Sequence, residues 1–187
     1  GTEKKLIISS GAADRFHVDF WKMVLTIVSK NNVDWLFMGP EPELKDTLFK
    51  SLNSSVASRI HFLGYRTDFQ NVMSLGDIYV DTYPIGGGWA MIEAMSQNIP
   101  CITYEHDYNR VFRKTENYFP LYDYAADSTF AVPFEIDKIE KRLKDFISSE
   151  KAVEDQLRKQ ADVLKIVNNP QDGIKELDQA LLEIAGR

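Results

Sequence analysis

The feature that most constrains the fold of this chain is its alternation of short apolar runs with longer segments of helical periodicity. We expect six strands, at Leu6 to Ser9, Trp35 to Met38, Ile60 to Leu63, Ile78 to Asp81, Cys101 to Tyr104 and Thr129 to Val132. Strands this apolar are buried on both faces, so helices must cover both sides of the sheet. The pattern predicts an α/β fold with a doubly wound, mostly parallel, six-stranded Rossmann-like sheet.

Helical periodicity marks the segments between the strands and the whole C-terminal part. The first helices are expected at Phe20 to Lys30, Pro42 to Leu52, Asp68 to Leu75 and Trp89 to Gln97. Beyond Ile136 we expect a tail that is helical throughout, interrupted once at Asn168-Asn169-Pro170. We therefore divide the chain into a Rossmann-like domain, residues 1–135, and C-terminal helices, residues 136–187, packed on that domain or on an absent one.

Charge and composition argue against several partners. There are 22 Lys and Arg against 28 Asp and Glu, a formal net charge of -6 with no basic stripe, so we expect no nucleic acid. No apolar run is long enough to suggest a membrane span. The single cysteine, Cys101, lies in an apolar run and is expected to be a buried thiol in a reducing compartment. A cytoplasmic protein is expected.

Ligands of open α/β sheets bind at the carboxyl ends of the strands. The loops at that edge begin near Ser10, Gly39, Gly64, Thr82 and Glu105. The most informative stretch runs from Asp81 to Met95, where a strand end leads through the glycine turn Gly86 to Gly88 into an apolar helix. Glycines allow close backbone approach, and the amides of a first helical turn favour a diphosphate. The alternative is a tight turn that needs only positive φ.

Two side chains on the helix after this turn also call for an explanation. A carboxylate at Glu93, on an otherwise apolar helix, is costly without a partner. A ribose diol would supply one, and a salt bridge or simple exposure is the alternative. Trp89, like Trp21 and Trp35, is expected to pack in the core, although its place at the ligand edge would also let it stack on a sugar or base.

These residues together resemble the C-terminal Rossmann-like domain of GT-B glycosyltransferases. The resemblance covers residues 5 to 115 and is carried by Arg59 to Arg66, Leu75 to Thr82, the glycine turn, Glu93-Ala94-Met95 and Ile99-Pro100. It is closest to the O-linked N-acetylglucosamine transferases and their bacterial N-glycosyltransferase relatives. Those proteins share the Asp81-Thr82 pair and the Arg110-Val111 pair. The segment Asp14-Arg15-Phe16 is also similar to the corresponding segment of that group.

The resemblance implies a role for each matching residue. The turn residues Gly87, Gly88, Trp89 and Ala90 would hold the diphosphate of the donor through backbone amides. Glu93 would bind the ribose hydroxyls, and the backbone around Tyr65 and Arg66 would read the base, expected to be uracil. Arg15 would act in catalysis by neutralising the leaving nucleotide, its alternative being a solvated loop arginine. His106 and Arg110 are further candidates.

The chain also departs from the group's pattern. Where the group has His-Thr-Thr, this chain has Gly88-Trp89-Ala90, so two hydroxyl contacts to phosphate are absent. Retaining relatives carry a Glu eight residues before the ribose-binding Glu. Here that position is Ile85, and we therefore expect an inverting displacement. GT-B enzymes need no bound metal, and no metal-ligand spacing is seen, so no metal or other cofactor is expected. Asp77 and Asp81 are expected to serve turn and strand-end roles.

The sequence therefore predicts the donor-binding half of a glycosyltransferase, which binds a nucleoside diphosphate sugar, expected to be a UDP-sugar. Because the chain starts Gly-Thr without Met, we expect it to be a fragment that lacks its N-terminal acceptor domain and is inactive alone. The acceptor could be a protein, a glycan or a lipid. The alternatives are a nucleotide-sugar 2-epimerase and a non-catalytic GT-B-like protein that binds a partner. Nucleotide affinity separates the last of these from an enzyme.

Overall fold

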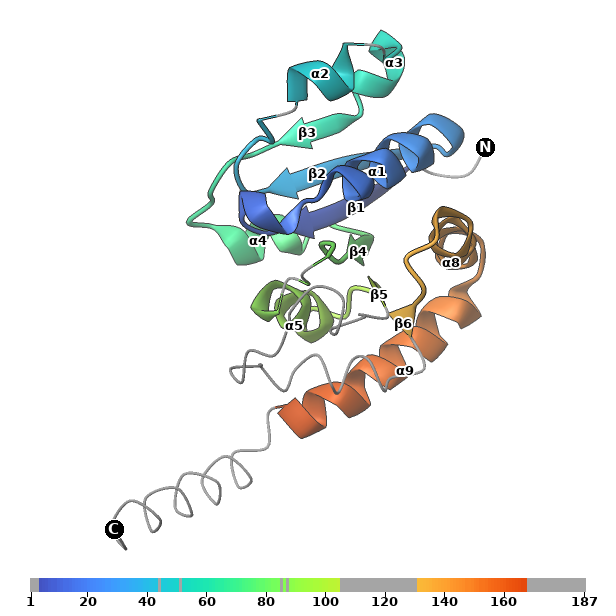
Figure 1. Cartoon of the computed structure of the whole chain (residues 1–187). Coiled ribbons are helices and arrows are strands. Elements are labelled where there is room, and N and C mark those ends of the chain that lie inside the picture. The colour runs from blue at the N-terminus through green and yellow to red at the C-terminus, as the bar shows by residue number, and fades with distance from the viewer. Residues whose placement is uncertain are drawn as a thin grey trace, which may run out of the picture.

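Six parallel strands form a single sheet in the order β3-β2-β1-β4-β5-β6 (Figure 1). The computed structural model describes residues 4–43, 45–50, 52–84, 86, 88–104 and 131–167. The strands are β1 Lys5–Ser10, β2 Val33–Met38, β3 Ile60–Phe62, β4 Ile78–Val80, β5 Cys101–Tyr104 and β6 Ala131–Val132. The predicted doubly wound sheet is confirmed, and its strand order reverses between β1 and β4.

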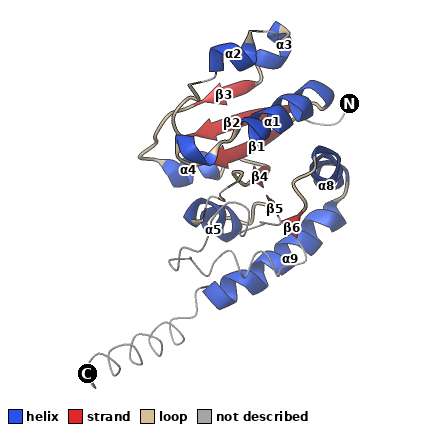
Figure 2. Cartoon of the chain, viewed as in Figure 1, coloured by secondary structure: helices blue, strands red, loops and turns tan. Residues whose placement is uncertain are grey.

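Helices cover both faces of the sheet, as expected (Figure 2). On one face lie α1 (Val18–Lys30) and α8 (Ile136–Ser148), and on the other lie α4 (Phe69–Met73), α5 (Trp89–Ser96) and α9 (Glu150–Val167). Neighbouring strand residues alternate between the two layers. Ile7 packs in the α1 and α8 layer while Ile8 packs in the α4, α5 and α9 layer. Burial of both faces therefore explains why the strands are apolar.

The expected helix Pro42 to Leu52 is wrong in extent. The structure has a short α2, Lys45–Phe49, followed by a separate α3, Ser54–Ala57. The side chain of Asn53 accepts a hydrogen bond of 2.9 Å from the amide of Ser55 and so caps the start of α3. The expected helix is therefore shorter at both ends, and α3 is an additional short helix that begins after it.

The C-terminal part is also interrupted where continuity was expected. Helices α8 and α9 are separated at Ser149, whose backbone is extended and whose hydroxyl accepts a 3.2 Å hydrogen bond from the amide of Ala152. This serine begins α9 in the manner of a helix cap. The expected break at Asn168-Asn169-Pro170 lies outside the described residues.

Two buried glutamines of α9 form hydrogen bonds with the backbone at the start of β5. The amide of Cys101 donates to Gln160 Oε1 at 2.7 Å, and Gln160 Nε2 donates to the carbonyl of Ile99 at 2.9 Å. Gln156 Nε2 donates to the carbonyl of Cys101 at 3.1 Å. The pairing with β6 involves only Thr103 and Tyr104, so these side chains satisfy backbone groups that β6 does not reach.

Several single-residue expectations are met in the core. Trp21 and Trp35 are buried, and the indole N–H of Trp35 donates to Ser9 Oγ at 3.0 Å. Cys101 is a buried free thiol whose pKa is raised by burial, with the charge of Asp81 adding to the effect. A membrane span would require a longer and more apolar helix than any in the described residues.

Candidate functional site

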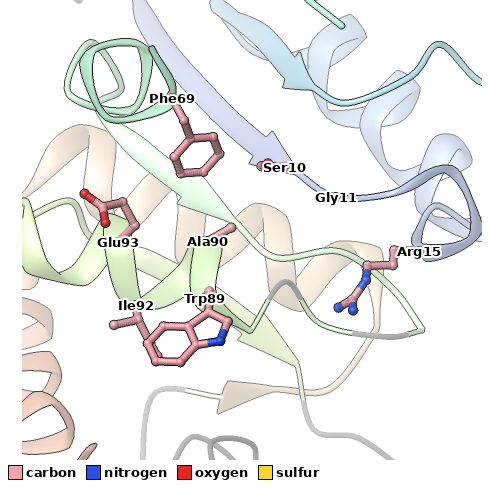
Figure 3. Close-up of a pocket in the computed structure, with 8 residues that line it drawn as sticks. All are labelled: Ser10, Gly11, Arg15, Phe69, Trp89, Ala90, Ile92 and Glu93. Carbon is pink, nitrogen blue, oxygen red and sulfur yellow. The ribbon is translucent and has the colours of Figure 1, made fainter. Parts of the chain in front are cut away.

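A pocket of about 500 Å³ opens beyond the carboxyl ends of β1 and β4, where the strand order reverses (Figure 3). Its walls come from the end of β1, the 3-10 turn η1 (Ala13–Arg15) and the N-terminal parts of α4 and α5. The lining residues are Ser10, Gly11, Arg15, Phe69, Trp89, Ala90, Ile92 and Glu93. This is the crevice in which doubly wound proteins bind ligands.

Glycines draw the loops after β1, β2 and β3 together at this edge. The amide of Gly11 donates to the carbonyl of Met38 at 3.1 Å, and the amide of Gly39 donates to that of Gly64 at 3.0 Å. Gly39 has φ of +148°, and a Cβ there would lie 2.1 Å from the carbonyl oxygen of Gly11. Only glycine fits this contact, which fixes the backbone beside the pocket.

The N-terminus of α5 lies at the pocket, because Trp89 and Ala90 line it. Gly88 precedes the helix with φ of 51° and ψ of -108°, and it provides no side-chain cap. The first-turn amides, including those of Trp89 and Ala90, have no acceptor within the helix. They also carry the positive end of the helix dipole. The predicted positive-φ turn is thus present at Gly88, while Gly87 lies outside the described residues.

Arg15 approaches this helix end from the loop after β1. Its Nη1 donates to the carbonyl of Gly86, so the guanidinium reaches the glycine turn. Backbone pairing sets the approach: Phe16 forms a parallel bridge with Tyr83, and the amide of His17 donates to the carbonyl of Tyr83 at 3.0 Å. The structure therefore brings together the arginine and the helix start that the sequence singled out separately.

Glu93 lies one turn after Trp89 on the same face of α5 and lines the pocket. Its Oε1 accepts a 2.8 Å hydrogen bond from Gln97 Nε2, which also donates to the carbonyl of Gln70 in α4 at 3.3 Å. Among the described residues it forms no ion pair, so the salt-bridge alternative is wrong there. The carboxylate is half-buried and held by an amide, which leaves it an acceptor in the pocket wall.

Two aromatic residues differ from what the sequence suggested. Trp89 was expected to pack in the core, but its side chain is 70% exposed. The buried face of α5 is taken by Met91, Ala94 and Met95, so the first residue of the helix points to the pocket instead. Phe69, the first residue of α4, also lines the pocket and was not predicted. Its signal was an aromatic residue opening the helix that follows β3.

Tyr65 and Arg66 lie in the loop after β3, and neither side chain lines the pocket. Tyr65 is 80% exposed. Arg66 forms a two-pronged ion pair with Asp68, with both contacts at 2.8 Å, which raises the pKa of Arg66 and lowers that of Asp68. The sequence-based role concerned the backbone of this loop, and it stays a prediction.

Two further polar residues have structural roles. His17 caps α1, because its Nδ1 accepts a 3.4 Å hydrogen bond from the amide of Asp19. Asp81 accepts hydrogen bonds of 2.9 Å from the amide of Thr82 and from Thr103 Oγ1, the strand-end role expected of it. His106 and Arg110 lie outside the described residues.

Asp77 also has a structural role, at the amino ends of β1 and β4. Its Oδ2 accepts a 2.8 Å hydrogen bond from the amide of Leu6, and its Oδ1 contacts Lys5 Nζ at 2.9 Å. It therefore fixes the start of β1 rather than lining the pocket. In the part of the chain that the structure describes, no group of three or more His, Cys, Asp or Glu residues could hold a metal ion.

The fold is Rossmann-like, and its crevice holds the N-terminus of α5 and the guanidinium of Arg15. The sequence profile of the family described as "Glycosyl transferases group 1" matches residues 5–131. The chain therefore belongs to the group 1 glycosyltransferases. Curated protein sequences contain no significant match to it.

Solved structures with the same fold include TarM and two O-GlcNAc transferases. TarM superposes with a TM-score of 0.71 at 14% identity, over 94% of this chain and 34% of TarM. The Thermobaculum terrenum O-GlcNAc transferase gives 0.64 at 14%, over 95% and 35%. The pneumococcal O-GlcNAc transferase GtfA, solved with UDP and GlcNAc, gives 0.58 at 16%, over 97% and 36%.

These likenesses agree with the family assignment. The expected resemblance to the C-terminal half of GT-B glycosyltransferases is confirmed. The chain spans about a third of the length of each of the three proteins.

Proposed function

We propose that this group 1 glycosyltransferase domain binds a UDP-sugar in the pocket between β1, α4 and α5 and supports transfer of its sugar. The observation that carries the proposal is the meeting of Arg15 with the N-terminus of α5, with Glu93 one turn further along the same pocket. A cation and a helix start supply the binding groups for a diphosphate, and a carboxylate supplies an acceptor for a diol.

The diphosphate would bind the backbone amides of Trp89 and Ala90. These amides donate to phosphate oxygens, and the helix dipole adds a favourable field. The guanidinium of Arg15 would add charge-assisted hydrogen bonds from the opposite wall. When the bond to the sugar breaks, negative charge develops on the leaving nucleotide, and the same groups would stabilise it in place.

The nucleoside would lie toward Glu93 and Phe69. The carboxylate of Glu93 accepts hydrogen bonds, so the two hydroxyls of a ribose suit it. Gln97 holds one carboxylate oxygen and, through Gln70, connects it to α4. Phe69 offers an apolar wall on the other side of the pocket, against which a ribose or base can pack (Figure 3).

The choice of nucleotide is supported by two solved structures. GtfA is solved with UDP and GlcNAc, and a TarM variant is solved with UDP, which favours uridine as the base. The acceptor site and the general base would come from a second domain, as in two-domain GT-B enzymes. The expected inversion rests on the residue type at Ile85; the family match does not support it, and it stays a prediction. The anomeric configuration of the product would test it.

The direct test is calorimetric titration of the 187-residue chain with UDP, ADP and GDP. We expect saturable UDP binding that Glu93→Ala weakens by about 1 to 3 kcal/mol, the cost of leaving hydrogen-bonding groups unpaired. Glu154→Ala, which removes an exposed glutamate on α9, is the matched control and should bind as the wild type.

A folded wild-type chain that binds none of the three nucleotides would contradict the proposal. It would favour instead a non-catalytic GT-B-like protein that binds a partner. Circular dichroism of the same sample establishes that the chain is folded. Unchanged UDP affinity in Glu93→Ala would keep nucleotide binding but remove this glutamate from the site.

A further inference from the structure

Trp89 is exposed in a way that the other tryptophans are not. The chain has three tryptophans. Trp21 and Trp35 are 1% and 0% exposed, whereas Trp89 is 70% exposed and lines the pocket. Its position in the pocket wall puts this exposed indole where a ligand bound in the pocket would cover it. The packing of the fold does not account for it, because the buried face of α5 is formed by other residues.

The position of Trp89 along the pocket indicates which part of a ligand it would meet. Figure 3 shows Phe69 and Glu93 toward one end of the pocket and Arg15 at the other, with Trp89 below and between them. Trp89 and Glu93 lie on one face of α5, separated by one turn of about 5.4 Å. Helical side chains lean toward the N-terminus, so the indole of Trp89 points away from Glu93 and toward the glycine turn.

The chemistry of the ligand then follows from the order of its parts. In a nucleoside diphosphate sugar the diphosphate joins the ribose to the transferred sugar. With the ribose at Glu93 and the diphosphate at the α5 amides, the sugar must lie past the helix start. That region is bounded by the indole of Trp89 and the guanidinium of Arg15. A pyranose ring has an apolar C–H face that packs on an indole.

We propose that Trp89 is the stacking platform for the hexopyranosyl ring of the donor and a determinant of sugar specificity. This inference rests on the proposed function, because it needs the diphosphate at the N-terminus of α5. Trp89 is then a binding residue whose side chain contacts the sugar and whose backbone contacts the phosphate. The side chain can therefore be changed while the phosphate contact is kept.

Paired titrations of the 187-residue chain separate the two contacts. UDP, UDP-glucose and UDP-GlcNAc are titrated into the wild type, Trp89→Ala and Trp89→Phe. Trp89→Ala should weaken both UDP-sugars by about fivefold or more. Its affinity for UDP should stay within about twofold of the wild type, because the backbone amide remains. Trp89→Phe, which keeps an aromatic face, should recover most of the loss.

Leu75→Ala is the matched control, since Leu75 is also exposed but lies outside the pocket. It should leave all three affinities unchanged. Equal loss of UDP and UDP-sugar affinity in Trp89→Ala would overturn the proposal, because the indole would then serve the nucleotide. Unchanged UDP-sugar affinity would overturn it as well. Absence of UDP binding in the wild type would instead remove the proposed function, and this inference with it.

Fluorescence gives an independent readout, because Trp89 is the tryptophan exposed to a solvent quencher. Acrylamide quenching of the wild type should therefore report mainly on this residue. UDP-glucose and UDP-GlcNAc should protect it from the quencher, and UDP should not. Equal protection by UDP and the UDP-sugars would contradict stacking on the sugar.

Discussion

Two glycines shape the pocket for different physical reasons. Gly39 is required by space, because a Cβ there would lie 2.1 Å from a backbone oxygen of Gly11. Gly88 is required by torsion, because a Cβ there would meet no atom within 4 Å, while φ of +51° disfavours any L side chain. A methyl group at Gly39 could be accommodated only by moving the backbone of two loops, whereas an unfavourable torsion at Gly88 can relax locally.

This difference predicts an order of stability between two variants. Gly88→Ala should lower the free energy of unfolding by about 1 to 3 kcal/mol, the cost of an unfavourable backbone conformation. Gly39→Ala should lower it by more, because the new methyl group collides with the main chain. Urea unfolding followed by circular dichroism measures both. A Gly88→Ala variant that is less stable than Gly39→Ala would contradict the account of the two glycines.

Gln97 is predicted to be a positioning residue for Glu93. It donates to the Glu93 carboxylate at 2.8 Å and to the carbonyl of Gln70 at 3.3 Å. Removing it in Gln97→Ala should weaken UDP binding by about fivefold, the equivalent of one hydrogen bond. The nucleotide still binds because Glu93 itself remains.

Ser96→Ala removes the neighbouring exposed side chain and should bind UDP as the wild type does. Titration of the two variants side by side measures the difference. If Gln97→Ala and Ser96→Ala bound UDP equally well, Gln97 would have no part in the site. A loss of UDP binding confined to Gln97→Ala, at unchanged melting temperature, would support the positioning role.

At the scale of single residues, the sequence predicted what depends on backbone conformation and missed what depends on packing. The turn at Gly88, the carboxylate at Glu93 and the arginine at position 15 all stand at the pocket, because strand ends of a doubly wound sheet converge. The exposure of Trp89 was not foreseen, since an apolar helix start does not show which side the sheet will take. Phe69 was missed because α4 is distant in sequence from α5, and the sequence does not show that these two helices line one pocket.

At the scale of elements, strands were easier to predict than helix ends. Burial on both faces makes each strand apolar and leaves a clear signal in the sequence, so all six strands were found. The starts of α3 and α9 depend on single side chains, Asn53 and Ser149. The glutamine contacts between α9 and β5 had no signal, because polar residues on a helix are usually read as its exposed face.

The contact of α9 with β5 predicts a large effect from a single glutamine. Gln160→Ala would leave the amide of Cys101 and the carbonyl of Ile99 buried without their present partner. The free energy of unfolding should fall by about 2 kcal/mol or more, since each unpaired buried group costs about 1 to 3 kcal/mol. Urea unfolding measures the change.

Hydrogen exchange shows where in the structure Gln160→Ala lowers stability. The Cys101 amide should exchange faster in Gln160→Ala, while amides in β2 should follow the global change only. Glu154→Ala, an exposed change on the same helix, is the control and should match the wild type. Wild-type stability in Gln160→Ala would show that α9 is not held to the sheet by this residue.

At the scale of the whole molecule, Glu140 links the helices that cover one face of the sheet. Its carboxylate contacts Lys144 Nζ in α8 at 2.7 Å and Lys30 Nζ in α1 at 3.3 Å, and its side chain is only 10% exposed. The hydrogen bond from Lys144 first, and that from Lys30 after it, lower the pKa of Glu140. A pKa lower in the folded state favours folding above the ordinary glutamate pKa and loses that effect as the pH falls through the folded-state value.

This linkage predicts how Glu140→Gln changes the pH dependence of stability. At about pH 7 the variant should be less stable by about 1 to 2 kcal/mol, because hydrogen bonds to a charged group are lost. The difference should shrink as the pH falls below about 4.3, where the wild-type carboxylate also becomes protonated. Urea unfolding at several pH values measures it. A difference that persisted at low pH would show that the contact acts through packing and not through charge.

For the whole molecule, the proposed donor site is the crevice between β1 and β4. The family assignment and the fold support it, and the pocket names the residues that would hold each part of the nucleotide.

The most direct measurement is a crystal structure of the chain grown with UDP. We expect phosphate oxygens within hydrogen-bond distance of the Trp89 and Ala90 amides, Arg15 beside them, and the ribose hydroxyls on Glu93. UDP bound elsewhere on the chain, or bound here with its ribose away from Glu93, would contradict the claim.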